Sequence, residues 1–186
     1  MVAMKYLFFF SMLVLSIGAH TFESYSGYIQ NQGGFKILKK DNLKFTLTAE
    51  SAEIKAQIDK LKTNDFISGI GVANNNQVLN IQSIDFIGLG QFVGLWLSPL
   101  GLFNVANFTD LQIYVPQKDM SLKNPKASMN YSITPGSGSS WVLFLSDEKQ
   151  IYYSNLYMNE RKAVIRFYST ETGAFLSEIS MNKLNQ

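Results

Sequence analysis

The chain has 186 residues, of which 46% are hydrophobic, no cysteine, and a formal net charge of +2. This composition excludes a disordered chain and a disulfide-stabilised miniprotein, and the nearly neutral charge gives no electrostatic footprint for nucleic acid. The one histidine, His20, lies close to the N-terminus, so the rest of the chain has neither imidazole nor thiol for catalysis or zinc binding. We therefore expect a non-catalytic protein without a metal or cofactor.

Residues 1–19 have the layout of a secretory signal peptide. Lys5 precedes an apolar run of roughly 10 to 14 residues, and small residues follow up to Gly18 and Ala19. A membrane-spanning helix needs about 20 apolar residues, so we expect no permanent membrane anchor. Cleavage after Gly18 or Ala19 would leave 15 basic and 14 acidic side chains. The expected location of the mature chain is periplasmic or extracellular.

Residues 20–91 are predicted to form a small domain of five strands and one helix. The expected strands are 24–31, 35–40, 43–49, 66–73 and 77–87, and the helix is 51–62. Apolar residues alternate along the strands and recur at helical spacing after Ser51, a capping residue; Gly69 and Gly71 indicate a bulge. The order of the elements, with Gly27 in the first strand, is similar to that of oligonucleotide/oligosaccharide-binding (OB) barrels. The resemblance implies a five-stranded barrel with one helix.

Residues 92–186 are predicted to contain strands only. The expected strands are 92–97, 102–108, 111–115, 128–134, 140–146, 151–157, 163–168 and 174–181. They recur about every 10 to 12 residues, which is typical of an antiparallel barrel or a β-sandwich. The long connection 116–127 is either a flap or a loose loop. Gly94-Leu95-Trp96 resembles the G-x-W with which lipocalins begin their barrel, and this implies a lipocalin-like or avidin-like barrel with Trp96 closing one end.

Three aromatic residues are the candidate ligand-binding side chains. The period-two pattern of the second half places Trp96, Tyr131 and Trp141 on inward faces of the expected strands. Barrels of this size are usually filled by side chains, so these residues either pack the core or line a pocket.

Four further residues form the candidate interaction surface. Tyr114, Tyr152, Arg166 and Tyr168 are expected on the opposite, outward strand faces. Aromatic residues and arginine are enriched at interfaces. The alternative is that the first domain or the long loop covers this face.

These patterns favour an exported binding or structural protein of the cell envelope that recognises a protein or a glycan, in an oligomeric state that remains open. One alternative is a carrier of a small apolar ligand inside residues 92–184, which requires a cavity on the order of 300 Å³. Another is a carboxylate-dependent hydrolase, which requires two acids about 5 to 10 Å apart. However, Asp147, Glu148, Glu160 and Glu171 all fall at expected hairpin tips.

Overall fold

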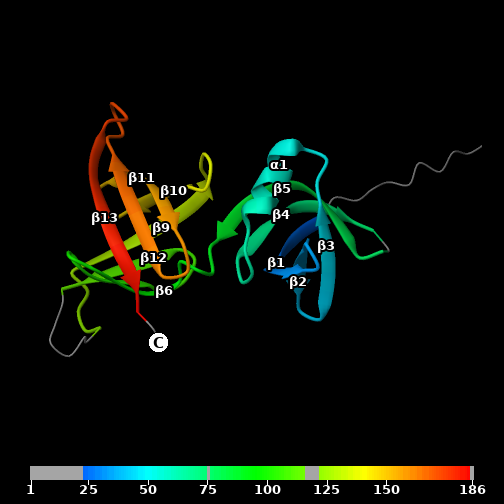
Figure 1. Cartoon of the computed structure of the whole chain (residues 1–186), viewed down its shortest axis with the longest axis horizontal. Helices are drawn as coiled ribbons and strands as arrows, with labels where there is room; N and C mark the ends of the chain where they lie inside the picture. Colours follow the sequence, from blue (N-terminus) through cyan, green and yellow to red (C-terminus); the bar gives the residue numbers. More distant parts are fainter. Residues whose placement is uncertain (1–22, 75, 116–121, 185–186) are drawn as a thin grey trace, which may run out of the picture.

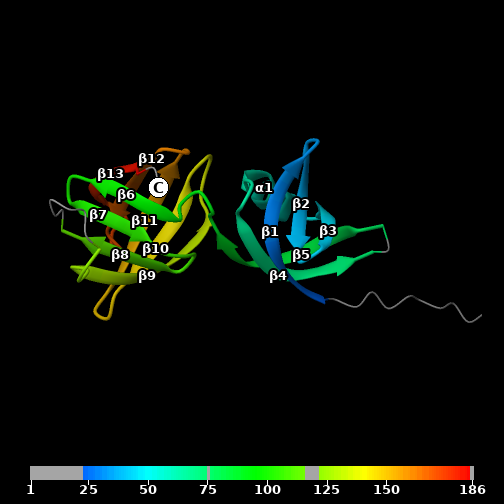
Figure 2. The same cartoon turned by 90° about the horizontal axis from the view of Figure 1, so that it is seen from below.

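The computed structural model describes residues 23–74, 76–115 and 122–184. These residues form two closed β-barrels that lie side by side (Figures 1 and 2). Residues 1–22, with the predicted signal peptide and His20, lie outside the described residues, as do residues 116–121 of the long connection. The chain is therefore mainly β, as its sequence predicts.

The first barrel has the elements predicted for residues 20–91. They are β1 (Glu23–Gln32), β2 (Phe35–Lys40), β3 (Leu43–Thr48), α1 (Ala52–Lys60), β4 (Phe66–Ala73) and β5 (Val78–Gly88). The strands close in the order β1-β2-β3-β5-β4. Only the β3–β5 pair is parallel among these strands, because the chain crosses over between them through α1 and β4. This closed five-stranded barrel is compatible with the OB-like arrangement.

Close backbone approach explains two glycines of this barrel. A Cβ atom on Gly27 would lie 2.5 Å from the carbonyl oxygen of Lys39 on the neighbouring β2, and one on Gly69 would overlap the carbonyl oxygen of Ser83 on β5. The β4–β5 register also shifts at Gly69 and Gly71, which confirms the predicted bulge. Small residues at these positions therefore let a five-stranded sheet curve into a closed barrel.

The helix begins after Ser51, as this capping residue predicts, and ends at Lys60, two residues before the predicted end at Lys62. The Ser51 hydroxyl accepts a hydrogen bond from the backbone N–H of Ile54, and Lys60 lies in the last turn, near the negative end of the helix dipole. The apolar residues Ile58 and Leu61 are buried in the core. The helix therefore packs one face onto the barrel and places Lys60 at its outer end.

The second half of the chain forms a closed barrel, so of the two predicted architectures the barrel is confirmed and the β-sandwich is not. Its strands are β6 (Gly94–Ser98), β7 (Gly101–Val105), β8 (Asp110–Tyr114), β9 (Ala127–Pro135), β10 (Trp141–Ser146), β11 (Ile151–Met158), β12 (Lys162–Tyr168) and β13 (Phe175–Lys183). Every neighbouring pair is antiparallel, and each strand follows the previous one around the barrel. Closure depends on a short seam in which Asn182 and Lys183 of β13 pair with β6.

The two barrels pack against each other through residues of both. Leu89 and Phe92, on the connection between β5 and β6, are buried in a core cluster that includes residues of each barrel. Phe108, in the turn between β7 and β8, stacks on Phe66 of β4 with ring centroids 5.8 Å apart. A Cβ atom on Gly88 would overlap the Phe108 ring, so glycine at this position allows the contact.

Candidate ligand-binding site

The second barrel contains an apolar cavity of about 300 Å³, called here the barrel cavity. Inward-facing side chains from strands β7 to β13 form its wall, together with one residue from each of two connections. The lining residues are Leu100, Phe103, Leu111, Ile113, Lys126, Ala127, Met129, Leu145, Tyr152, Phe167 and Ile179. Among the described residues that line it, Lys126 is the only one with a charged side chain, so the cavity suits an apolar molecule.

The barrel cavity lies at the end of the second barrel that is remote from the first. Ala127 and Met129, at the start of β9, line it. The opposite end of β9 runs into the turn that contacts the first barrel, where the Lys60 ammonium donates a hydrogen bond to the carbonyl of Gly136. Figure 1 shows the same arrangement, with α1 and the β9–β10 turn on facing sides of the two barrels.

The end of the second barrel next to the first is filled by aromatic side chains. Trp96 is fully buried and its Nε1 donates to the carbonyl oxygen of Phe92 at 2.8 Å. The Phe92 ring meets Tyr131 edge-on at 5.5 Å, and the Tyr131 hydroxyl donates to the carbonyl oxygen of Asn107. Burial raises the pKa of Tyr131 above its ordinary value, so this hydroxyl stays protonated as a donor. These residues close one end of the barrel.

A lysine from the last strand covers the outside of this closed end. The Lys183 ammonium lies 5.1 Å from the centre of the Trp96 ring and donates to the carbonyl oxygen of Gln91. Burial lowers the pKa of Lys183. Gly94 has a φ of +128°, which L side chains rarely adopt, and a Cβ atom there would approach the Lys183 side chain at 3.1 Å. The glycine of the G-x-W triplet therefore leaves room for this lysine.

None of the three candidate ligand-binding residues lines the barrel cavity. Trp96 and Tyr131 pack the closed end. Trp141 is also largely buried, but it lies at the junction of the two barrels, with the Lys60 ammonium 5.9 Å from its ring. The sequence therefore placed these residues on inward faces, and the structure places them at the end next to the first barrel rather than at the hollow end.

Three of the four candidate surface residues point outward, and one points into the barrel. Arg166 and Tyr168 point outward from β12. Tyr114 points outward too, but it is buried and its hydroxyl donates to Gln112. Tyr152 was expected on the outer face, and the structure corrects this because its side chain lines the barrel cavity.

The outer face of the second barrel carries four aromatic rings in a row, called here the aromatic ladder. Phe144, Tyr153, Tyr168 and Phe175 come from β10, β11, β12 and β13, with successive ring centroids 5.6, 6.0 and 6.1 Å apart. Phe144 and Phe175, at its two ends, are exposed. The ladder is a continuous apolar strip that crosses four strands.

The period-two pattern in the sequence also places Ile113, Met129, Leu145 and Phe167 on inward faces, but nothing in it marks these residues as a site. Strand alternation gives the side on which a residue lies and not whether the space inside is filled.

The chemistry available at the barrel cavity is that of binding. The buried hydroxyl of Ser154, which also points into the barrel, is already used because it donates to the carbonyl oxygen of Leu143. Among residues 23–74, 76–115 and 122–184, no three histidine or acidic side chains cluster as a metal site would require. The absence of catalysis, cofactor and metal stays a prediction.

The described residues contain no helix of the length and apolar character that a membrane span requires. Comparison with protein-family models, with curated proteins and with solved structures finds no match to this chain.

Proposed function

We propose that this chain is a non-catalytic binding protein that holds a small apolar ligand in the barrel cavity. The observation that carries the proposal is the cavity itself, because about 300 Å³ lined almost wholly by apolar side chains is within the range of small-molecule sites. A barrel closed at one end by Trp96 and hollow at the other has the shape that retains an apolar guest away from water.

The fold supports the same proposal. The closed antiparallel barrel of eight strands, with the Gly94-Leu95-Trp96 triplet on its first strand, is compatible with a lipocalin-like barrel, and the five-stranded barrel before it with an OB-like one. We propose the two-barrel arrangement as an OB-like module followed by a lipocalin-like module. In this proposal the second barrel binds the ligand and the first supports its closed end.

The proposed site of action is outside the cytoplasm. The support is the signal-peptide pattern of residues 1–19, with Lys5 before the apolar run and small residues after it. Measuring the mass of the protein recovered from outside the cytoplasm tests whether it is exported and whether its signal peptide is removed. A chain that lacks residues 1–18 or 1–19 agrees with the proposal, and an intact N-terminus on a protein retained in the cytoplasm contradicts it.

Binding of a neutral fluorescent probe tests the ligand proposal. The probe N-phenyl-1-naphthylamine is apolar and fluoresces strongly once it leaves water, so titration should give saturable binding. The variant Ala127→Phe places a large side chain into the barrel cavity and should weaken binding at least tenfold. Ser128→Phe, at the next residue of β9 and exposed, is the matched control and should leave the affinity unchanged. Equal affinities for the two variants would refute binding inside the barrel.

The aromatic ladder favours a second candidate function, recognition of a protein or a glycan of the cell envelope. Exposed rings at both ends of a continuous strip match the aromatic enrichment of interaction surfaces. Co-sedimentation with isolated cell envelopes tests it. The double variant Tyr153→Ser/Phe175→Ser should lose envelope binding and keep the affinity for the apolar probe. Unchanged co-sedimentation would reject the ladder as a recognition surface.

A further inference from the structure

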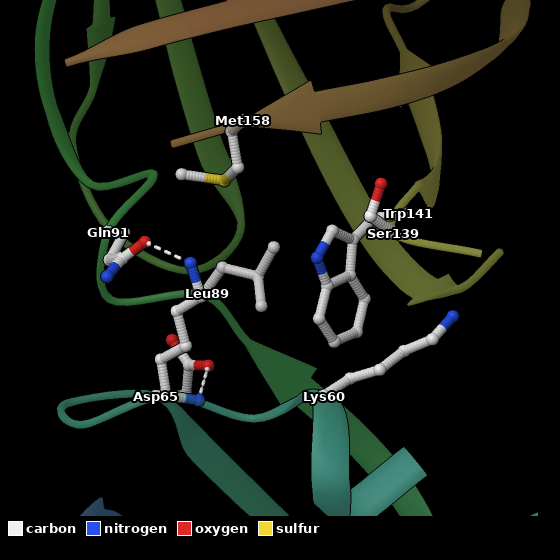
Figure 3. A pocket seen from close by; sticks show the side chains of 8 residues that line it. Lys60, Asp65, Leu89, Gln91, Ser139, Trp141 and Met158 are labelled. Atoms are coloured by element: carbon white, nitrogen blue, oxygen red, sulfur yellow. Dashed lines mark hydrogen bonds between the residues drawn. The ribbon is translucent and has the colours of Figure 1, made fainter. Parts of the chain in front are cut away.

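A second cavity, called here the junction cleft, lies where the two barrels meet. It has a volume of about 190 Å³ and is lined by residues of both barrels and of the connection between them. The first barrel supplies Lys60, Lys62 and Asp65, which lie in and just after α1. Figure 3 shows that Leu89, Trp141 and Met158 surround its interior. The cleft therefore exists only when both barrels are in place.

The single carboxylate of the junction cleft is already occupied. Asp65 is 2% exposed, and one of its oxygens accepts the backbone N–H of Lys62 at 2.7 Å while the other accepts that of Gly90 at 2.9 Å. Burial raises the pKa of Asp65. The carboxylate therefore serves the backbone of the junction, and each of its oxygens has a protein partner before any ligand arrives.

Hydrogen-bond donors in the cleft remain available. Among the described residues, the Lys62 ammonium makes one hydrogen bond, 3.4 Å to the Gln91 side chain, although an ammonium has three donors. The Trp141 indole nitrogen faces the side of the cleft where Leu89 lies (Figure 3). With Lys60 beside the same ring, two ammonium groups stand against one carboxylate.

The remaining wall of the cleft is apolar. Leu89 is buried, Met158 is half-buried, and the face of the Trp141 ring completes this surface. A cavity of about 150 Å³ is sufficient for benzene. The junction cleft therefore has room for one ring or a short chain together with a charged group.

We propose that the junction cleft binds a small organic carboxylate that carries a single ring or a short aliphatic chain. The carboxylate accepts hydrogen bonds from the Lys62 ammonium and the Trp141 indole N–H, and the apolar part covers Leu89 and Met158. Hydrogen bonds to charged groups are the strong ones, and both donors come from residues that line the same cleft. An inorganic anion leaves the apolar wall in water, and a neutral molecule leaves the ammonium without its counter-charge. The site is independent of the barrel cavity.

Isothermal titration of the full-length mature chain with benzoate tests the proposal. Benzoate should bind with a dissociation constant below about 1 mM. Benzamide, which keeps the ring and loses the charge, and sulfate, which keeps charge and loses the ring, should each bind at least tenfold more weakly. Equal affinity for benzamide would mean that the cleft is an apolar pocket, and equal affinity for sulfate would mean that it is an anion site; either result overturns the proposal. The absence of benzoate binding at 10 mM, about ten times the expected upper limit of the dissociation constant, also overturns it.

Variants locate the binding site. Lys62→Gln removes the charge of an exposed side chain and should weaken benzoate binding at least tenfold with no change in the thermal midpoint. Lys149→Gln, on the β10–β11 turn, is the matched control and should bind as the wild type does. Trp141→Phe keeps a ring and loses the N–H, so it should weaken binding severalfold even if Lys62→Gln cannot be purified. Full affinity in Lys62→Gln or Trp141→Phe overturns the proposal, and so does loss of benzoate binding in Ala127→Phe.

Discussion

The variant Asp65→Ala tests how the two barrels are joined. It removes a buried carboxylate that accepts two backbone N–H groups, one at the end of α1 and one, on Gly90, in the connection to the second barrel. A hydrogen bond to a charged group contributes about 1.5–3 kcal/mol. Loss of both is partly offset because the variant no longer buries a charge. We expect the free energy of unfolding to fall by about 2–4 kcal/mol.

Urea unfolding followed by tryptophan fluorescence and by far-ultraviolet circular dichroism measures this loss. With an m-value of about 2 kcal/mol/M, the midpoint should fall by about 1–2 M. Both tryptophans belong to the second barrel and circular dichroism reports on both barrels, so the two signals show whether the barrels unfold together. A loss below about 0.5 kcal/mol would refute the reasoning, because it would mean that water replaces the carboxylate at no cost.

The pH dependence of the stability of Asp65→Ala tests the direction of the Asp65 pKa shift. Burial raises the pKa of Asp65 above its value in the unfolded chain, so the folded state binds this proton first as the pH falls. The titration of Asp65 therefore adds stability as pH is lowered from above its folded pKa towards its unfolded value of about 3.9. The stability difference between wild type and Asp65→Ala should widen between pH 7 and about pH 4. A narrowing difference would show that the two backbone hydrogen bonds outweigh burial.

Three further experiments test the packing within and between the two barrels. A double-mutant cycle of Phe66→Ala and Phe108→Ala should give a coupling energy of about 0.5–1.5 kcal/mol in urea unfolding, and zero coupling would contradict the stacked contact. Gly69→Ala forces a Cβ atom onto the carbonyl oxygen of Ser83 and should cost about 1–3 kcal/mol, so an unchanged thermal midpoint would contradict the close approach of β4 and β5. Trp96→Phe loses a buried indole hydrogen bond and leaves a void, for an expected loss of about 2–3 kcal/mol in the same assay; a loss under about 0.5 kcal/mol would mean that the closed end is loosely packed.

The succession of strands could be predicted because turn residues separate short alternating runs. At the tip between β10 and β11, for example, Asp147 accepts the backbone N–H groups of Lys149 and Gln150, which is what a turn aspartate does. The hairpin at residues 170–173 likewise has a positive φ at Gly173. Local chemistry of this kind needs no knowledge of distant residues, so the sequence alone is sufficient.

Which alternate residues of β11 face inward could not be predicted, and this is why Tyr152 was expected on the wrong face. Both faces of the strand have aromatic and polar residues, because Tyr152 and Ser154 point inward while Tyr153 and Asn155 point outward. The buried Ser154 would count as an outward residue by polarity. Its hydroxyl is satisfied by the carbonyl oxygen of Leu143 on the neighbouring strand, a partner that only the folded barrel supplies.

The junction could not be predicted either, because its contacts join residues far apart in the chain. Asp65 reads in sequence as an ordinary turn residue after a helix, and nothing local pairs it with Gly90. Phe108 ends a predicted strand, and its stacking on Phe66 depends on how the two barrels pack. The tryptophan of the junction cleft, Trp141, has the same inward pattern as any core residue.

The two ends of the second barrel are suited to different tasks. Trp96 and Phe92 fill the end next to the first barrel, and the apolar area that they bury stabilises the junction whether or not a ligand is bound. Among the described residues, the first barrel does not line the hollow end, so a ligand that enters there does not separate the barrels. An apolar ligand in the barrel cavity and a carboxylate in the junction cleft would then bind at opposite ends of the second barrel. The filled core around Trp96 separates the two sites. Coupling between sites requires an element with two arrangements that both ligands bias. The affinity of one site should therefore not depend on whether the other is occupied.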